Sequence, residues 1–169
     1  MIAIELYLQH LHYYVHFLDQ ENANSNAGAG GTTQWQSFTI SNTGQLSRVS
    51  WKMANPVING NPQPVQLTVY RGQGTNGTQL AQSQNLYTPP YNDSNGNYIS
   101  GQYVVFNVFS QNISVTSGEI MTVKLELTSG NQNVGFLSLH TGNPYSGGRG
   151  SNDHLWDYIF RVYTVPGSQ

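Results

Sequence analysis

The sequence feature that most constrains the fold is a series of short runs in which apolar and polar residues alternate. In residues 120–128, Met121, Val123 and Leu125 alternate with polar residues. A period of two residues indicates a strand with one face buried and the other in water. Comparable runs recur at intervals of about 10 to 15 residues, at 35–40, 46–53, 65–71, 103–109, 134–140 and 158–163.

Turn-forming dipeptides separate these runs, among them Asn76-Gly77, Asn95-Gly96 and Ser117-Gly118. No window of useful length between them has helical periodicity. About seven to nine short strands spaced in this way are typical of two packed antiparallel sheets. We therefore expect residues 35–165 to form an all-β domain, an antiparallel β-sandwich of the jelly-roll type.

The first 18 residues have a different pattern. Apolar residues recur with a 4-3-4-3 spacing at Ile4, Leu8, Leu11, Val15 and Leu18. This spacing predicts a short N-terminal amphipathic helix over residues 1–18. Such a short helix is marginal alone, so its apolar stripe must pack against something.

We expect these five residues to form an assembly interface with other copies of the chain. Packing against the chain's own sandwich and binding to a membrane surface remain alternatives, although the polar face lacks the Lys and Arg that contact lipid phosphates. Residues 19–34 are rich in Gly and Asn, which predicts a flexible linker between helix and sandwich.

Charge excludes several classes of function. Charged residues make up 8% of the 169 positions, against roughly 25% in ordinary soluble domains. The six cations are scattered singly along the chain, so nucleic acid is not an expected partner.

The chain has no cysteine, which excludes disulfides and thiolate zinc sites. No transmembrane segment is expected, because no apolar run approaches about 18 residues. The N-terminus lacks the pattern of a signal peptide, so export would follow earlier removal of a signal or assembly into a virion.

The sequence offers little for catalysis, and we expect a protein that is not an enzyme, with no catalytic residues, cofactor or metal. Asp157 and Arg161 are four residues apart and are predicted to form a structural ion pair; a carboxylate pair of Asp153 and Asp157 is the alternative. His12 and His16 have a spacing that could bind a metal, but a solvated polar stripe is the preferred interpretation.

Carbohydrate binding is the alternative function. Carbohydrate sites combine aromatic faces with polar groups, and the loop around Tyr145 and Arg149, with the nearby Trp156, is the segment most like a ligand site. A Gly-rich connection between strands is the other interpretation of this loop. Trp51 lies between Val49 and Met53 on one strand face, and we predict that it is part of the core.

The order of several motifs resembles an extracellular jelly-roll module found in bacterial surface proteins and in phage and viral fibre or surface proteins. The motifs are Gln36-Ser-Phe38, Gly44-Gln-Leu46, Leu67-Thr-Val-Tyr-Arg-Gly-Gln-Gly-Thr-Asn-Gly77, Leu80-Ala81, Val115-Thr-Ser-Gly118, Asn143-Pro-Tyr-Ser-Gly-Gly148 and Asp157-Tyr-Ile-Phe-Arg-Val-Tyr163. The resemblance implies a sandwich fold, an exterior location and adhesion or display. The start Met1-Ile-Ala-Ile-Glu5 also resembles type IV pilins, but the residues that follow are too polar for a pilin helix.

These observations lead to one expected function. The chain is expected to be a structural subunit of an extracellular filament, fibre or virion surface, located outside the cell or on the particle, with itself as its main partner. A carbohydrate-binding module that recognises a cell-surface glycan is the alternative. An oligomeric adhesin for a protein receptor is a third class that the sequence does not separate from the first.

Overall fold

The computed structural model describes residues 16–22, 33–53, 63–87, 102–128, 139–141, 145–151 and 156–166. Its elements are β1 (Phe17–Asn22), β2 (Thr33–Thr39), β3 (Gly44–Met53), β4 (Gln63–Arg71), β5 (Thr78–Tyr87), β6 (Gln102–Asn107), the 3-10 turn η1 (Phe109–Gln111), β7 (Ser114–Val115), β8 (Ile120–Leu127), β9 (Leu139–Thr141), β10 (Trp156–Tyr158) and β11 (Phe160–Pro166).

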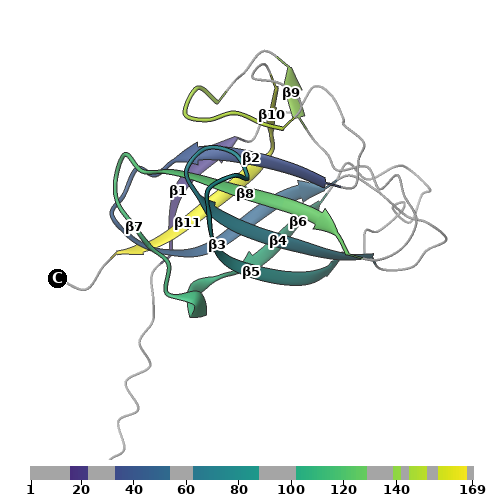
Figure 1. Cartoon of the computed structure of the whole chain (residues 1–169), viewed down its shortest axis with the longest axis horizontal. Coiled ribbons are helices and arrows are strands. Elements are labelled where there is room, and N and C mark those ends of the chain that lie inside the picture. Colours follow the sequence, from purple (N-terminus) through teal and green to yellow (C-terminus); the bar gives the residue numbers. More distant parts are fainter. Residues whose placement is uncertain are drawn as a thin grey trace, which may run out of the picture.

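The strands form two antiparallel sheets packed face to face (Figure 1). One, the β3 sheet, has the order β1-β11-β3-β6, with β7 also paired to β3. The other, the β4 sheet, has the order β2-β8-β4-β5. A separate short pair, β9 with β10, lies at one end of the sandwich. The expected all-β antiparallel sandwich is therefore confirmed.

Alternation in the sequence becomes burial in the structure. In β8, Met121, Val123 and Leu125 are fully buried between the sheets, and they pack with the inward residues of β4. The β3 sheet contributes its own inward residues from three adjacent strands: Val49, Trp51, Phe106, Phe160 and Val162. Trp51 is fully buried, as predicted from its position between two apolar neighbours.

The end of the predicted helix and both ends of the predicted linker are wrong. Residues 17–22 form strand β1, which pairs with β11 at the edge of the β3 sheet. Leu18 therefore lies on a strand. Residues 17–22 form hydrogen bonds with the backbone groups of β11 that would otherwise be unpaired at the edge of the sheet. Thr33 and Gln34 begin β2. Ile4, Leu8, Leu11 and Val15 lie outside the described residues, as do residues 23–32.

Helical structure is scarce in what the structure describes. Its one helical element is η1, a single turn after β6 that ends at Asn112 in the left-handed conformation, with φ of 54°. Within the described ranges, no helix is long and apolar enough to cross a membrane.

Candidate functional site

The edge strand β1 carries the most exposed apolar side chains of the described structure. Phe17 and Leu18 are each 48% exposed. Large apolar side chains are usually covered at a sheet edge, where unpaired backbone groups already favour association. Among the described strands, β1 pairs with β11 alone. This edge is therefore the first place to look for an interaction site.

A β-bulge gives this edge its local shape. The pairing with β11 shifts between Leu18 and Gln20, so Asp19 has no register partner and its side chain is re-aimed. The Asp19 carboxylate accepts the backbone N–H groups of Ser41 and Asn42, at 3.0 and 2.8 Å, and the side-chain amide of Asn42 at 2.9 Å. These bonds hold the turn between β2 and β3 against β1.

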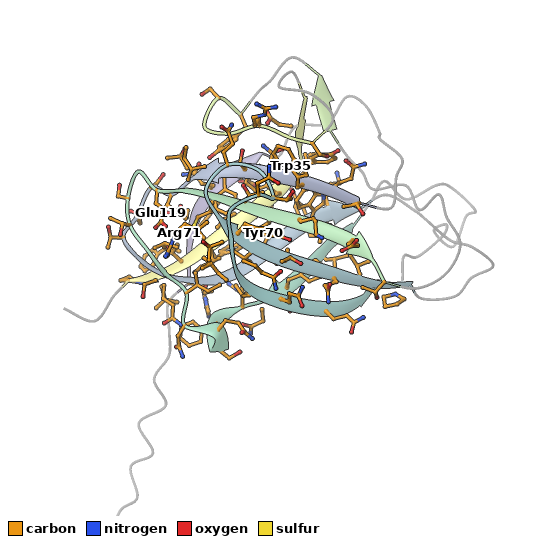
Figure 2. The ribbon with its side chains drawn as sticks, in the orientation of Figure 1. Trp35, Tyr70, Arg71 and Glu119 are labelled. Carbon is orange, nitrogen blue, oxygen red and sulfur yellow. The ribbon has the colours of Figure 1, made fainter. Side chains whose placement is uncertain are left out.

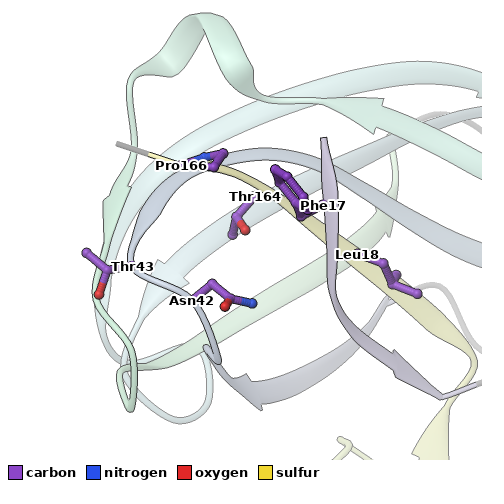
Figure 3. A pocket seen from close by; sticks show the side chains of 6 residues that line it. All are labelled: Phe17, Leu18, Asn42, Thr43, Thr164 and Pro166. Atoms are coloured by element: carbon purple, nitrogen blue, oxygen red, sulfur yellow. The ribbon is translucent and has the colours of Figure 1, made fainter. Parts of the chain in front are cut away.

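A pocket of about 320 Å³ lies between this turn, β1 and the end of β11 (Figure 3). Its lining residues are Phe17, Leu18, Asn42, Thr43, Thr164 and Pro166. None of them is charged. A pocket of this size with apolar walls can accept one or two apolar side chains, with amide and hydroxyl groups at its rim.

No motif in the sequence could have identified this pocket. Its walls come from three segments that are brought together by strand pairing, and only Leu18 was among the predicted interface residues. The sequence signal that could have pointed to this pocket was Phe17, because it continues the apolar N-terminal segment.

The loop predicted to bind a glycan is fastened to the sandwich. The ring of Tyr145 packs edge-on against Phe160, with centroids 5.3 Å apart. Its hydroxyl accepts the N–H of Thr39 at 3.1 Å and donates to Gln20 at 2.9 Å. Burial of this hydroxyl raises the pKa of Tyr145 to about 12. Tyr145 thus acts as a tie between the loop, β2 and β1.

The other two predicted glycan-binding residues are placed differently. Arg149 is exposed, and its backbone bonds to Ser37, with the Ser37 N–H donating to its carbonyl at 2.9 Å. Trp156 begins β10, and its side chain lies outside the described part of the structure. The structure therefore places Tyr145 and Arg149 on one loop, with the Tyr145 ring packed on the sandwich and Arg149 exposed.

The predicted ion pair between Asp157 and Arg161 is wrong. Asp157 is fully buried, and its carboxylate accepts from the Gln36 amide at 2.9 Å and the Tyr145 N–H at 3.0 Å. Arg161 instead donates to Glu21 of β1 at 2.6 Å. The chain breaks its strand at Ile159, so Asp157 and Arg161 belong to different strands and face different surroundings.

Of the two histidines whose spacing could bind a metal, His16 lies in the part of the chain that the structure describes. No group of three or more His, Asp or Glu that could hold a metal lies within the described residues. His16 packs against Phe109 with ring centroids 6.2 Å apart. Burial and, to a smaller extent, the nearby Arg48 lower the pKa of His16, which favours its neutral form. His12 lies outside the described residues.

Membership of a known family was tested by comparing the chain with known proteins. No protein-family model matches it, and no curated protein sequence matches it either.

Proposed function

We propose that this protein is a non-enzymatic structural subunit of an extracellular filament, fibre or virion surface, which self-assembles through its N-terminal segment. The observation that carries the proposal is the exposed pair Phe17 and Leu18 beside the uncharged pocket. Leu18 is the last position of the apolar repeat that begins at Ile4 in the sequence, and Phe17 precedes it. The repeat therefore leads along the chain to the β1 wall of the pocket, and its apolar side chains suit a pocket without charged residues.

The driving force is burial of apolar surface between copies. Fully burying a large apolar side chain contributes roughly 1.5 to 3 kcal/mol. Phe17 and Leu18 retain about half of their surface for this purpose. The repeat residues Ile4, Leu8, Leu11 and Val15 add to it if a neighbouring copy covers them. Several such contacts, repeated along an assembly, are enough to offset the entropy lost on association.

We also propose that the sandwich is a jelly roll. The strand pairs are nested, with β4–β5 innermost, then β3–β6, then β2–β8, and β1–β11 outermost. A long antiparallel hairpin rolled into two sheets has this order, and eight strands in two sheets are the framework of jelly rolls in capsid and lectin domains. An exterior location, outside a cell or on a virion surface, agrees with the sparse charge, which weakens repulsion between closely packed copies.

Removal of residues 1–15 tests the proposal. The deletion ends before His16 so that β1 and its bonds to β11 remain intact. We expect the full chain to form large species by light scattering and electron microscopy, and the truncated chain to remain a folded monomer. If the truncated chain assembles as the full chain does, the proposed role of the segment is wrong.

A second variant separates the pocket from the segment. Leu18→Ser removes an exposed apolar side chain from the pocket wall and should weaken assembly while leaving the fold intact. The matched control is Val105→Ser, because Val105 is similarly exposed at 45% but lies on β6, at the other end of the strand order of the β3 sheet. Equal weakening by both substitutions would contradict the assignment of the pocket.

A further inference from the structure

The cations of this chain are not distributed evenly over the fold. Arg48 and Lys52 lie on β3, where they alternate with the buried Val49 and Trp51. Arg161 lies on β11 between buried Phe160 and Val162. Alternate residues of a strand point to opposite faces. Three of the six cations in the chain therefore occupy the outer face of the β3 sheet.

Two tyrosines share this face and hold the guanidinium groups in place. Arg48 lies over the ring of Tyr163, with its Cζ 4.7 Å from the centroid. Arg161 lies over the ring of Tyr103 at 4.2 Å. Arg161 on β11 and Tyr103 on β6 are separated by β3, where Ser50 pairs with Arg161 on one side and with Val105 on the other. Its small side chain leaves room for Arg161 to reach across β3.

The positive charge on this face is only partly balanced. Arg161 is paired with Glu21. Elsewhere, Arg71 is paired with Glu119 (Figure 2), and Lys124 with Glu126 at 2.9 Å. Among the described residues, neither Arg48 nor Lys52 has a carboxylate partner. The outer face of the β3 sheet thus carries three positive side chains and one negative one, although the chain as a whole has a net charge of −2.

Arg48 also has unused hydrogen-bonding capacity. Its Nε is buried and has no acceptor within the described structure. Because this Nε is buried, a ligand carboxylate would be held by the terminal amino groups of the guanidinium, which can bind it through paired N–H groups.

We propose that the outer face of the β3 sheet, formed by Arg48, Lys52, Arg161, Tyr103, Tyr163 and Asn107, binds an acidic, carboxylated oligosaccharide. The cations select a negative ligand. The tyrosine hydroxyls and the exposed Asn107 amide can form hydrogen bonds with the hydroxyl groups of a sugar. This binding surface adjoins the pocket beside β1, because Tyr163 pairs with Leu18, and it includes no residue of the loop 145–151.

The same observations argue against the other negative polymers. Nucleic acid presents a dense row of phosphates, and proteins that bind it usually neutralise several with clustered cations. This face has three cations, one already paired. An acidic peptide would be expected to bury apolar side chains, and the exposed apolar residues on this face, Val105 on β6 and Leu18 beside Tyr163, lie at opposite edges of the sheet. A ligand with sparse carboxylates and many hydroxyls fits better.

The test uses the full chain and oligogalacturonate, an oligomer of uronic acid, as the probe in isothermal titration calorimetry. We expect binding that weakens as salt is raised. Lys52→Gln and Arg48→Gln should each weaken the affinity about tenfold, which is the effect of losing one charge-assisted hydrogen bond. Arg71→Gln is the matched control, because Arg71 is an exposed cation at the end of β4, in the other sheet, and it should change the affinity less than about twofold.

Several results would overturn the proposal. These are no binding of oligogalacturonate at low salt, equal losses in the Arg71 control, or tighter binding of a neutral dextran, a poly-glutamate peptide or an oligonucleotide of the same length. If Arg48→Gln disturbs folding, Lys52→Gln decides the outcome alone. Light scattering of each variant shows whether assembly is intact, so failure of this proposal is distinguishable from failure of the proposed function.

Discussion

The carboxylate of Asp157 accepts a hydrogen bond of 2.9 Å from the side-chain amide of Gln36, in the interior of the protein. The two residues are 121 positions apart in the sequence, and both are fully buried. The carbonyl oxygen of the same Gln36 amide accepts the N–H of Tyr158 at 3.0 Å. One side chain of β2 thus satisfies both a buried charge and a buried backbone group of β10.

Gln36→Leu should therefore be strongly destabilising. It removes a donor from the buried carboxylate and leaves the Tyr158 N–H without its acceptor, which together cost about 2 to 4 kcal/mol of unfolding free energy. Urea unfolding measures this loss. The control is Gln66→Leu, because Gln66 lies on the outer side of β4 and should change stability by less than about 0.5 kcal/mol. A loss below about 1 kcal/mol in Gln36→Leu would show that the bond contributes little.

Two buried threonines on adjacent strands of the β4 sheet should respond in opposite ways to the same substitution. The hydroxyl of Thr68 is buried and has no partner among the described residues, whereas the hydroxyl of Thr122 donates to the Gly72 carbonyl at 2.7 Å. Thr68→Val should raise the free energy of unfolding by about 1 kcal/mol, because a desolvated hydroxyl is removed. Thr122→Val should lower it by about 1 kcal/mol. Thermal unfolding of the pair is the measurement, and a loss in both would mean that the Thr68 hydroxyl has a partner.

Gly148 is where the loop of residues 145–151 makes its closest approach to β2. A Cβ at this position would lie 1.8 Å from the carbonyl oxygen of Ser37. Gly148→Ala must push the loop outward, break the bond between the Ser37 N–H and the Arg149 carbonyl, and cost about 1 to 3 kcal/mol. Limited trypsin digestion should then cut after Arg149 faster than in the unmodified protein. Ser146→Ala, at an exposed position of the same loop, should leave the cutting rate unchanged; equal acceleration would contradict the explanation.

Alkaline pH should destabilise the protein through two tyrosines. Burial raises the pKa of Tyr145 and of Tyr158 to about 12, from an ordinary value of 10.0. Between these values the unfolded chain loses the phenolic protons and the folded chain keeps them, so stability falls as pH rises. The decrease is at most about 1.4 kcal/mol per pH unit for each tyrosine. Urea unfolding at pH 9, 10 and 11 tests this, and Tyr158→Phe should reduce the slope by at most about half, because burial raises the pKa of Tyr103 as well. An unchanged slope in that variant would exclude Tyr158 as a source.

The strands of the core could be predicted because their evidence is local. In β8 every second residue is apolar, and Met121, Val123 and Leu125 are all buried. Trp51 was placed correctly for the same reason. The period of the apolar residues depends on the backbone geometry of a strand, so it can be detected without knowing the neighbouring strands.

Strand β1 could not be predicted in this way. Its sequence FLDQEN does not alternate, because the bulge at Asp19 shifts the pattern by one residue. Only the open edge of β11 and the turn at Ser41 and Asn42 explain why these residues form a strand. The same limit applies to the pocket, whose walls come from three distant segments, and to Asp157, whose partners are Gln36 and the Tyr145 backbone.

The sequence alone determined that this chain forms β-strands with buried and exposed faces, and that it has few charges to place on them. In the sequence, however, the charged residues are scattered, and nothing shows which of them are neighbours in the folded chain. Tertiary structure decided which of them are neighbours: strand pairing places Glu21 beside Arg161, Arg161 beside Ser50, and Arg48 beside Tyr163. The physical reason is that alternation assigns a side chain to a face of its own strand, whereas its neighbours on that face depend on hydrogen-bonded pairing between strands up to 140 residues apart.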